Sequence, residues 1–311
     1  MDRPPFDTML YRSPLLQVAS FRAEPDQPGF NDSGPAENHI FVFPRTSCII
    51  QHEGKAPFLA GPSCINFYNR GQVYIREAVG RQGDYCEWFA IEPGALLEVV
   101  RSFDPSVSDH PDRPFRFDFG PSDPRSYLLQ RLLVRHLTGE ERPDPLFVEE
   151  TALRVFARVA RSAAKAAGMT LASPSPEAGS RHRDLTEAAK IVLQRQFREA
   201  LSLPEVARET GASVFHLSRV FRRQTGLTLH AYQAHLRLIT ALEVVAVREA
   251  DLTGVALDLG FSSHSHFTAA FRKAFGVTPS AIRQAASARK LRELAAQIEG
   301  GGGRPLTGSL V

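Results

Sequence analysis

Residues 202–226 read SLPEVARETGASVFHLSRVFRRQTG, and residues 252–283 read LTGVALDLGFSSHSHFTAAFRKAFGVTPSAIR. Each stretch predicts a short helix, a tight turn at a glycine (Gly211 or Gly260) and a second helix that begins after a serine. A longer helix, expected over 230–248, joins the two stretches. This pattern, present twice, is typical of two helix-turn-helix units in one all-α region.

The second helix of each unit is predicted to have an apolar side and a polar, basic side. The apolar residues recur at helical spacing and are Leu217, Val220, Phe221, Phe267, Phe271 and Phe275. The opposite sides carry Val214, Phe215, Ser218, Arg219, Arg222 and Arg223 in the first unit and His264, Ser265, Thr268, Ala269, Arg272 and Lys273 in the second. A capped helix with an exposed basic side can dock in the major groove, so we expect double-stranded DNA as a partner.

The two units resemble the AraC family of bacterial transcription regulators, above all in the spacing GF…F…AF…FG.TPS..R between Gly260 and Arg283. The resemblance implies a seven-helix domain over 183–285, with both second helices in successive major grooves. The base-reading positions that it implies are Val214, Phe215, Ser218, Arg219, His264, Ser265, Thr268 and Ala269. The side chains expected to hold phosphates and set the register are Arg222, Arg223, Arg272 and Lys273.

These positions differ in how specifically they point to DNA. Arg219 is the strongest candidate, because arginine can pair bidentately with guanine O6 and N7. Phe215 can face DNA or pack against the support helix, and His264 can read a base or be an ordinary residue at the helix start. Ala269 stands where the family often has a polar or arginine side chain, which favours thymine-methyl or shape contacts there.

The N-terminal part of the chain predicts a β-rich domain. Short apolar runs alternate with turn residues, and the expected strands include 39–43, 48–52, 64–68, 73–76 and 85–91. This spacing favours a small sandwich or barrel, and with NRGQVYIR at 69–76 it resembles the cupin-like barrels that precede AraC-type domains. We therefore expect an α+β chain: an N-terminal cupin-like β-barrel with a helical hairpin, then an all-α seven-helix domain with two helix-turn-helix units.

A helical hairpin and a linker are predicted between these domains. Helical spacing over 122–137 and 146–167, broken by two prolines, predicts the hairpin, and the resemblance implies that it dimerises the chain. Residues 169–182 (MTLASPSPEAGSRH) show no period and predict a flexible linker. The expected parts are an effector domain (1–120), the hairpin (121–168), the linker (169–182), the tandem units (183–285) and a tail that is helical and then disordered (286–311).

The resemblance implies that the barrel binds a small-molecule effector. Strand alternation suggests a mixed aromatic and polar pocket made by His39, Tyr68, Tyr74, Arg76 and Trp88. An equally good interpretation places the aromatic residues in a plain core and Arg76 in a salt bridge. The expected protein partners are a second copy of the chain, giving a homodimer, and RNA polymerase.

Three cysteines offer an alternative kind of regulation. Cys48, Cys64 and Cys86 lie on predicted strands and could converge as a thiol- or metal-responsive site. Free cysteine is also among the most buried residue types, and we favour that simpler interpretation. No HxH pair precedes the linker, which argues against a cupin metalloenzyme, so we expect no catalytic residue, no bound metal and no cofactor.

Composition sets the remaining limits. The hydrophobic residues, 43% of 311, suffice for two cores, and residues 183–283 hold 13 Lys and Arg against 9 Asp and Glu. No apolar run is long enough to span a bilayer, and the first ten residues do not resemble a signal peptide. We therefore expect a cytoplasmic protein that does not contact a membrane.

Overall fold

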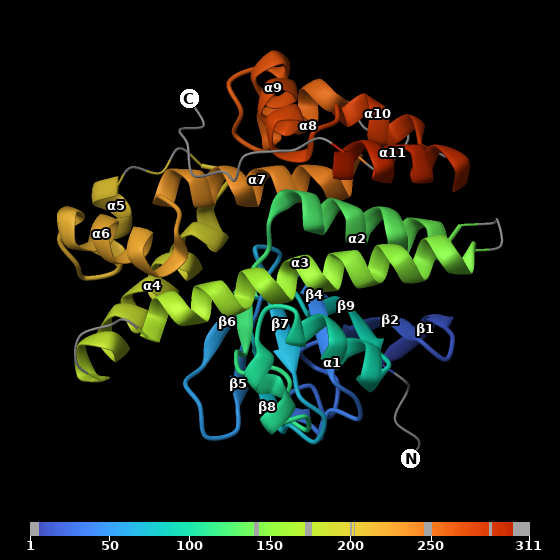
Figure 1. The fold of residues 1–311 in the computed structure, drawn as a ribbon. Coiled ribbons are helices and arrows are strands. Elements are labelled where there is room, and N and C mark those ends of the chain that lie inside the picture. Colours follow the sequence, from blue (N-terminus) through green and yellow to red (C-terminus); the bar gives the residue numbers. More distant parts are fainter. Residues whose placement is uncertain are drawn as a thin grey trace. The chain divides into compact units, whose positions relative to one another are not determined.

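The computed structural model describes residues 6–139, 143–171, 176–199, 201, 203–245, 251–285 and 288–300. The chain divides into two compact units (Figure 1). The first unit comprises Met1–Ser126 and Leu133–Gly168, and the second comprises Tyr127–Leu132 and Met169–Val311. The first unit contains the β-sheets and the second is helical, so the chain has the mixed α+β character expected from its sequence.

Two antiparallel sheets form the first unit. The larger sheet has the order β1-β2-β9-β4-β7-β10, with β1 Asp7–Arg12, β2 Leu16–Ala23, β9 Asp84–Ile91, β4 Ile40–Pro44, β7 Cys64–Tyr68 and β10 Phe119–Pro121. The smaller sheet has the order β3-β8-β5-β6, with β3 Asp32–Ser33, β8 Tyr74–Ala78, β5 Cys48–His52 and β6 Phe58–Ala60. Among the described residues the strands thus form two sheets rather than one closed ring, because each sheet ends in two edge strands. This arrangement fits the sandwich that the strand spacing allowed, and the cupin-like barrel stays a prediction.

Strand alternation gives the larger sheet two buried faces. One face packs against the smaller sheet, and this inter-sheet core consists of Val42, Cys48, Ile50, Phe58, Ala60, Cys64, Tyr68 and Cys86. The other face packs on helix α3 (Pro145–Leu171), where the rings of Phe41 and Phe156 have centroids 5.1 Å apart. A side chain at Gly120 would place its Cβ 2.4 Å from that of Ala163, so β10 depends on glycine to approach α3.

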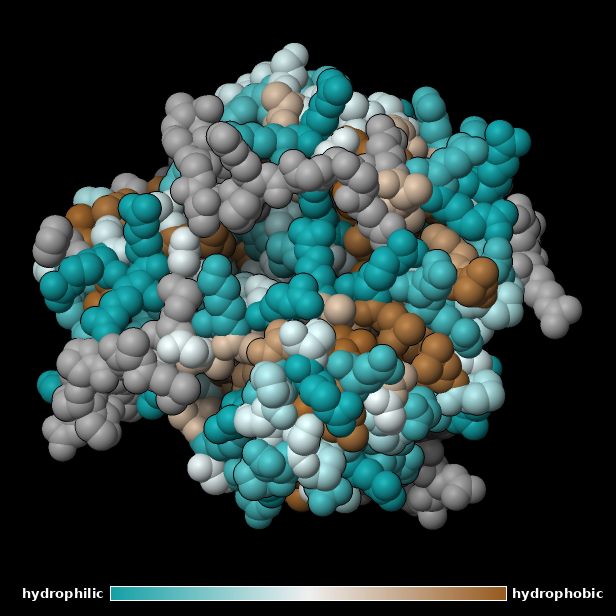
Figure 2. Space-filling view, in the orientation of Figure 1, coloured by the Kyte–Doolittle hydropathy of each residue, from teal (hydrophilic) through white to brown (hydrophobic). Residues whose placement is uncertain are grey.

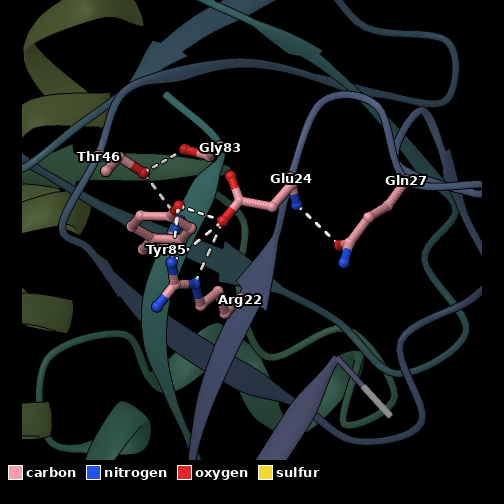
Figure 3. Close-up of polar contacts among 6 residues, drawn as sticks. All are labelled: Arg22, Glu24, Gln27, Thr46, Gly83 and Tyr85. Carbon is pink, nitrogen blue, oxygen red and sulfur yellow. Dashed lines mark hydrogen bonds and ion pairs between the residues drawn. The ribbon is translucent and has the colours of Figure 1, made fainter. Parts of the chain in front are cut away.

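A polar network on the surface ties β2 to β9 (Figure 3). The Tyr85 hydroxyl donates to Glu24, and Arg22 donates to the same carboxylate at 3.1 Å. On the other side of the network, the Thr46 hydroxyl donates to the Gly83 carbonyl at 2.6 Å. In the lower part of Figure 2, hydrophilic side chains cover much of the visible surface, below a patch of hydrophobic ones.

The first unit also contains short helices between its strands. Helix α1 (Pro93–Arg101) is capped by Glu92, whose carboxylate accepts from the amides of Gly94 and Ala95 at 2.9 Å each. A 3₁₀ turn (Pro105–Asp109) follows it. Two helices, α2 (Pro124–Leu137) and α3, occupy the residues predicted for the hairpin, and their pairing as a hairpin stays a prediction.

The second unit holds seven helices in its described part between residues 176 and 285, followed by α11 (Ala288–Gly300). The seven are α4 Pro176–Gln196, α5 Leu203–Glu209, α6 Val214–Thr225, α7 Leu229–Val245, α8 Leu252–Asp258, α9 His264–Phe275 and α10 Pro279–Gln284. No helix among the described residues is both long and apolar enough to cross a membrane. The tail after residue 300, predicted to be disordered, lies outside the described residues.

The helices α3 and α4 correct the limits of the predicted linker. α3 continues to Leu171 and α4 already begins at Pro176, so only residues 172–175 separate them, and these lie outside the described residues. Two local preferences explain the difference. The last turns of α3 are rich in alanine, the strongest helix former, and proline is well tolerated in the first turn of a helix.

Candidate nucleic-acid interface

The first helix-turn-helix unit is formed by α5 and α6. The chain turns between them at Gly211, whose φ of 65° lies in the left-handed region that favours glycine. Ser213 then caps α6, because its hydroxyl accepts from the amide of His216 at 3.3 Å. Ser202, which precedes α5 in the sequence, lies outside the described residues.

The second helix-turn-helix unit, formed by α8 and α9, repeats this construction. Asp251 caps α8 by accepting from the amides of Thr253 and Gly254 at 3.0 Å each. Gly260 makes the turn with a φ of 80°. Two serines, Ser262 and Ser263, precede α9, and Ser263 is its cap, because its hydroxyl accepts from the amide of His266 at 3.1 Å.

The apolar sides of α6 and α9 are buried as the helical spacing predicts. The exposed fraction is at most 2% at all six predicted positions, which are Leu217, Val220, Phe221, Phe267, Phe271 and Phe275. The rings of Phe271 and Phe275 pack with centroids 4.3 Å apart, and the ring of Phe221 meets that of Tyr232 on α7 at 5.4 Å. Burial of these sides fixes which side of each helix faces solvent.

The opposite side of α6 is exposed and basic. Arg219, Arg222 and Arg223 are exposed, Ser218 is half-buried, and Val214 is 40% exposed, which is high for an apolar side chain. The side chain of Phe215 lies outside the described residues, so its two interpretations stay open. Arg222 and Arg223 also occupy the last turn of α6, where positive charge opposes the negative end of the helix dipole.

The opposite side of α9 forms an open hollow of about 630 Å³. All six predicted residues of this helix line it, together with Thr278 at the start of α10: His264, Ser265, Thr268, Ala269, Arg272 and Lys273. The His264 Nε2 lies 3.4 Å from the Thr268 hydroxyl, so these two neighbours can orient each other. Thr278 was not predicted here, although the Thr-Pro pair that starts α10 is a recognisable capping signal.

Two histidine rings, of His182 and His216, lie close together beside α6. The His182 ring of α4 lies 5.6 Å from the His216 ring, with Arg219 and Arg223 close enough to act on it. Desolvation is the largest cause that lowers the pKa of His182, and the positive charges of Arg223 and Arg219 lower it further. At neutral pH the positive charge beside α6 therefore comes from arginine rather than from His182.

The five effector candidates of the first unit do not share one site. Tyr68 belongs to the inter-sheet core, and Tyr74 and Trp88 pack against it. His39 lies on the opposite face of the larger sheet, where its ring meets Phe115 at 6.3 Å and its Nδ1 accepts from the amide of Arg70. The prediction was wrong for His39 because alternation pairs residues within a strand but does not say which face is the interior.

Arg76 is buried in an ion pair. Its Nε lies 3.1 Å from the carboxylate of Asp84, the two side chains are 4% and 8% exposed, and its guanidinium lies over the ring of Phe21. Burial raises the pKa of Asp84 although Arg76 opposes this. The structure thus agrees with the interpretation of Arg76 as a salt-bridge partner.

The three cysteines converge, but as buried thiols. Cys48, Cys64 and Cys86 are thiols rather than halves of a disulfide, and they belong to the inter-sheet core. Burial raises the pKa of Cys48 and of Cys86 well above the ordinary range, so both thiols stay protonated at neutral pH. In the described part of the chain, no three His, Cys, Asp or Glu side chains are grouped so as to hold a metal ion.

His52 is a candidate effector-binding residue that the strand pattern did not indicate. It is 1% exposed, its Nδ1 lies 2.8 Å from Asp118 and 2.6 Å from Gln72, and its Nε2 is buried with no hydrogen-bond partner. Burial alone would raise the pKa of Asp118, but hydrogen bonds from His52 and Lys55 outweigh it and lower that pKa. Nothing in the alternation of β5 distinguishes His52 from a core residue.

Comparison with known proteins agrees with the geometry of the second unit. The pattern of a helix-turn-helix domain family matches residues 206–285. The chain is 34% identical over 91 residues to the probable transcription factor PqrA of Proteus vulgaris, covering 29% of this chain and 75% of PqrA. It is 36% identical over 92 residues to the transcriptional activator RhaS of Escherichia coli strain SE11, covering 30% of this chain but only 33% of RhaS.

A solved structure, a transcriptional regulator with an AraC-type DNA-binding domain from Chromobacterium violaceum, is 30% identical. It matches with a TM-score of 0.30 over 40% of this chain and 99% of its own. The two capped helix-turn-helix units, the matched family pattern and the likeness to PqrA define a tandem helix-turn-helix protein. The chain belongs to the AraC family of transcription regulators.

Proposed function

We propose that this chain is a sequence-specific DNA-binding transcription regulator that places α6 and α9 in the major groove. The observation that carries the proposal is the matched pair of serine-capped helices, each with one buried apolar side and one exposed side carrying basic residues. Helices held in this way present their outward side chains to base edges and phosphates. The function is binding, and none of the site residues is assigned to catalysis.

Specificity and positioning are divided between the outward residues. We assign base contacts to Val214, Phe215, Ser218, Arg219, His264, Ser265, Thr268 and Ala269. The phosphate contacts are assigned to Arg222, Arg223, Arg272 and Lys273. Since phosphate contacts release counterions, binding should weaken steeply with salt.

In vitro selection with the full chain and a random duplex library tests this function. We expect a bipartite consensus, with the two parts about one turn of DNA apart. Footprinting should protect both parts, and the affinity for unrelated DNA should be lower by a factor of at least about 10³. Recovery of unenriched sequences, with equal affinity for all duplexes, would contradict the proposal.

For the first compact unit, which contains the β-sheets, we propose a cupin-like effector domain that binds a small molecule between its two sheets. The support is His52 Nε2, a buried polar atom without a hydrogen-bond partner, which lies beside the rings of Tyr68 and Tyr74. Leaving such an atom unpaired costs about 1–3 kcal/mol, which a hydrogen-bonding ligand with an apolar body would recover. A rise in Tm with one class of metabolite, lost in His52→Leu and kept in the exposed control His110→Leu, is the expected result.

We also propose that the chain works as a homodimer through residues 121–168. The first turn of α3 exposes Leu146 to 67%, which suits an apolar contact. Joining two DNA-binding units makes binding of the second site intramolecular and raises avidity by about 10²–10⁴. Sedimentation of the chain and of Leu146→Glu tests this proposal, and contact with RNA polymerase stays a prediction.

The thiol-responsive alternative has one supporting observation, the convergence of Cys48, Cys64 and Cys86 in the inter-sheet core. Their burial and raised pKa values oppose it, because oxidation needs an accessible thiolate. DNA binding that responds to peroxide in the native chain, but not after all three cysteines become serine, would favour this alternative over a metabolite effector.

A further inference from the structure

Arg237 joins the two helix-turn-helix units through backbone carbonyls. It lies on α7, between the units, and donates to three carbonyl oxygens: Nε to Phe197 at 2.6 Å, one terminal nitrogen to Glu199 at 2.7 Å and the other to Gly260 at 2.7 Å. Phe197 and Glu199 lie between α4 and α5, next to the first unit. Gly260 is the turn of the second unit.

Both ends of this bridge are fixed to their own units. The Phe197 side chain packs against the core that contains Val206, Leu217 and Phe221 of the first unit. On the other side, the Gly260 turn is held by the amide of Phe261, which donates to the Ala256 carbonyl at 2.9 Å. A shift of one helix-turn-helix unit relative to the other would therefore break hydrogen bonds of Arg237.

The bridge is also closely packed. A Cβ at Gly260 would lie 2.4 Å from the Arg198 carbonyl oxygen and 2.8 Å from the Arg237 guanidinium. Real Cβ atoms do not approach backbone so closely, so the turn of the second unit sits directly on the segment that leads into the first. Desolvation lowers the pKa of Arg237, but arginine starts so high that its charge strengthens all three hydrogen bonds.

We propose that Arg237 is a positioning residue that fixes the spacing and angle between α6 and α9, and with them the spacing of the two DNA segments that the chain binds together. This inference rests on the proposed DNA-binding function. Arg237 itself contacts carbonyls rather than bases, so its effect appears in how the two sites combine and not in which bases are read.

Gln233 supplies a matched control one turn earlier on α7. Its Nε2 donates to the same two carbonyls, Phe197 at 3.2 Å and Glu199 at 2.9 Å, and it is buried. Its described bonds end on the side of the first unit and do not reach Gly260. A residue that only stabilises the fold should behave like Gln233.

The test measures dissociation constants of the full chain for three duplexes built from the selected consensus: native spacing, two base pairs inserted between the parts, and one part alone. In the wild type the native spacing should be strongly preferred over the insertion. In Arg237→Met this preference should fall about tenfold, a small part of the avidity gained by linkage, while affinity for one part changes less than about twofold. The first control, Gln233→Leu, should lower Tm and keep the spacing preference. The second control, Arg208→Met, removes an exposed arginine on α5 and so matches the loss of charge in Arg237→Met; it should also keep the spacing preference.

Each outcome decides between the claims. If Arg237→Met folds, as judged by circular dichroism, and keeps the wild-type spacing preference, the inference is wrong although sequence-specific binding stands. If the wild type has no sequence preference, the proposed function itself fails. If Arg237→Met does not fold, Arg237→Lys and Gly260→Ala take its place, and an unchanged spacing preference in both overturns the inference.

Discussion

The two units of the chain handle charged side chains in opposite ways. The first unit buries the Arg76–Asp84 pair and His52 between or beside its sheets. The second unit keeps Arg219 and Arg272 on the solvent side of α6 and α9 and fills the inner sides with apolar residues. Charge inside the first unit is therefore tied to its stability, whereas charge on the second is free to meet a polyanion.

Arg76→Met should give the largest effect, because it leaves Asp84 buried without its ion-pair partner. We expect the free energy of unfolding of the first unit to fall by about 3–5 kcal/mol, measured by urea denaturation. The control is Arg22→Met, which removes an arginine whose side chain is 71% exposed in the surface network of Figure 3 and should leave the midpoint nearly unchanged. Equal midpoints for the two variants would erase the contrast between the units.

Arg219→Ala should show the reverse behaviour, a loss of recognition without a loss of stability. Removing a bidentate contact to guanine should cost about 1–3 kcal/mol of discrimination at one base position, which binding to single-base variants of the consensus would reveal. Arg223→Ala should instead weaken binding to all sequences alike and reduce the salt dependence. If Arg219→Ala kept the full sequence preference, the assignment of Arg219 as a base-reading side chain of α6 would be wrong.

The serine caps test whether the two DNA-facing helices are equally anchored. Ser213→Ala and Ser263→Ala should each lower stability by about 1 kcal/mol, since each removes the acceptor of an unpaired helix amide. Thermal unfolding and amide exchange within α6 and α9 measure the loss, and the Ser→Gly variants should lose less. A marked difference between the stability losses of these two variants would show that the two helix-turn-helix units are not equally stabilised by their caps.

The buried thiols should give the smallest effect, a loss of stability at high pH. The pKa values of Cys48 and Cys86 are raised in the folded chain, so the unfolded chain releases these protons first as pH rises. Stability should thus be complete below the ordinary thiol pKa and decline above it, by less than about 1 kcal/mol in all at pH 8.5. Denaturation at pH 7 and 8.5, with Cys48→Ser and Cys86→Ser as controls, checks the sign; no dependence would mean that these thiols are accessible when folded.

The second unit was predictable because its signals are local. Ser213, Gly211 and Gly260 mark helix starts and turns within a few residues of chain, and α6 and α9 begin at the residues that these signals indicate. Arg237 was missed because an apolar period describes only one side of α7. Its three acceptors are carbonyls, which any residue can supply, so no side-chain pattern marks them.

The first unit was less predictable because strand pairing is not local. The strands β4, β5, β7, β8 and β9 follow the predicted runs closely, but β1, β2, β3, β6 and β10 were not among those runs. Strand β2 pairs with β9, more than sixty residues away. Whether a strand face points to the second sheet or to α3 depends on that pairing. His39 and Tyr68 were grouped together for this reason, although they occupy opposite faces.

The hollow on α9 also has a consequence for how such a regulator changes its targets. The side chains that line it lie outside the Phe267–Phe271–Phe275 core and the Ser263 cap, and surface changes usually alter stability by no more than about 0.5 kcal/mol. Many combinations of these residues are thus compatible with one scaffold. With the base-reading role that we propose for His264, Ser265, Thr268 and Ala269, we expect a library randomised at these positions to yield folded proteins with new operators. A descendant of this chain would then need only a few substitutions to act on a new set of genes.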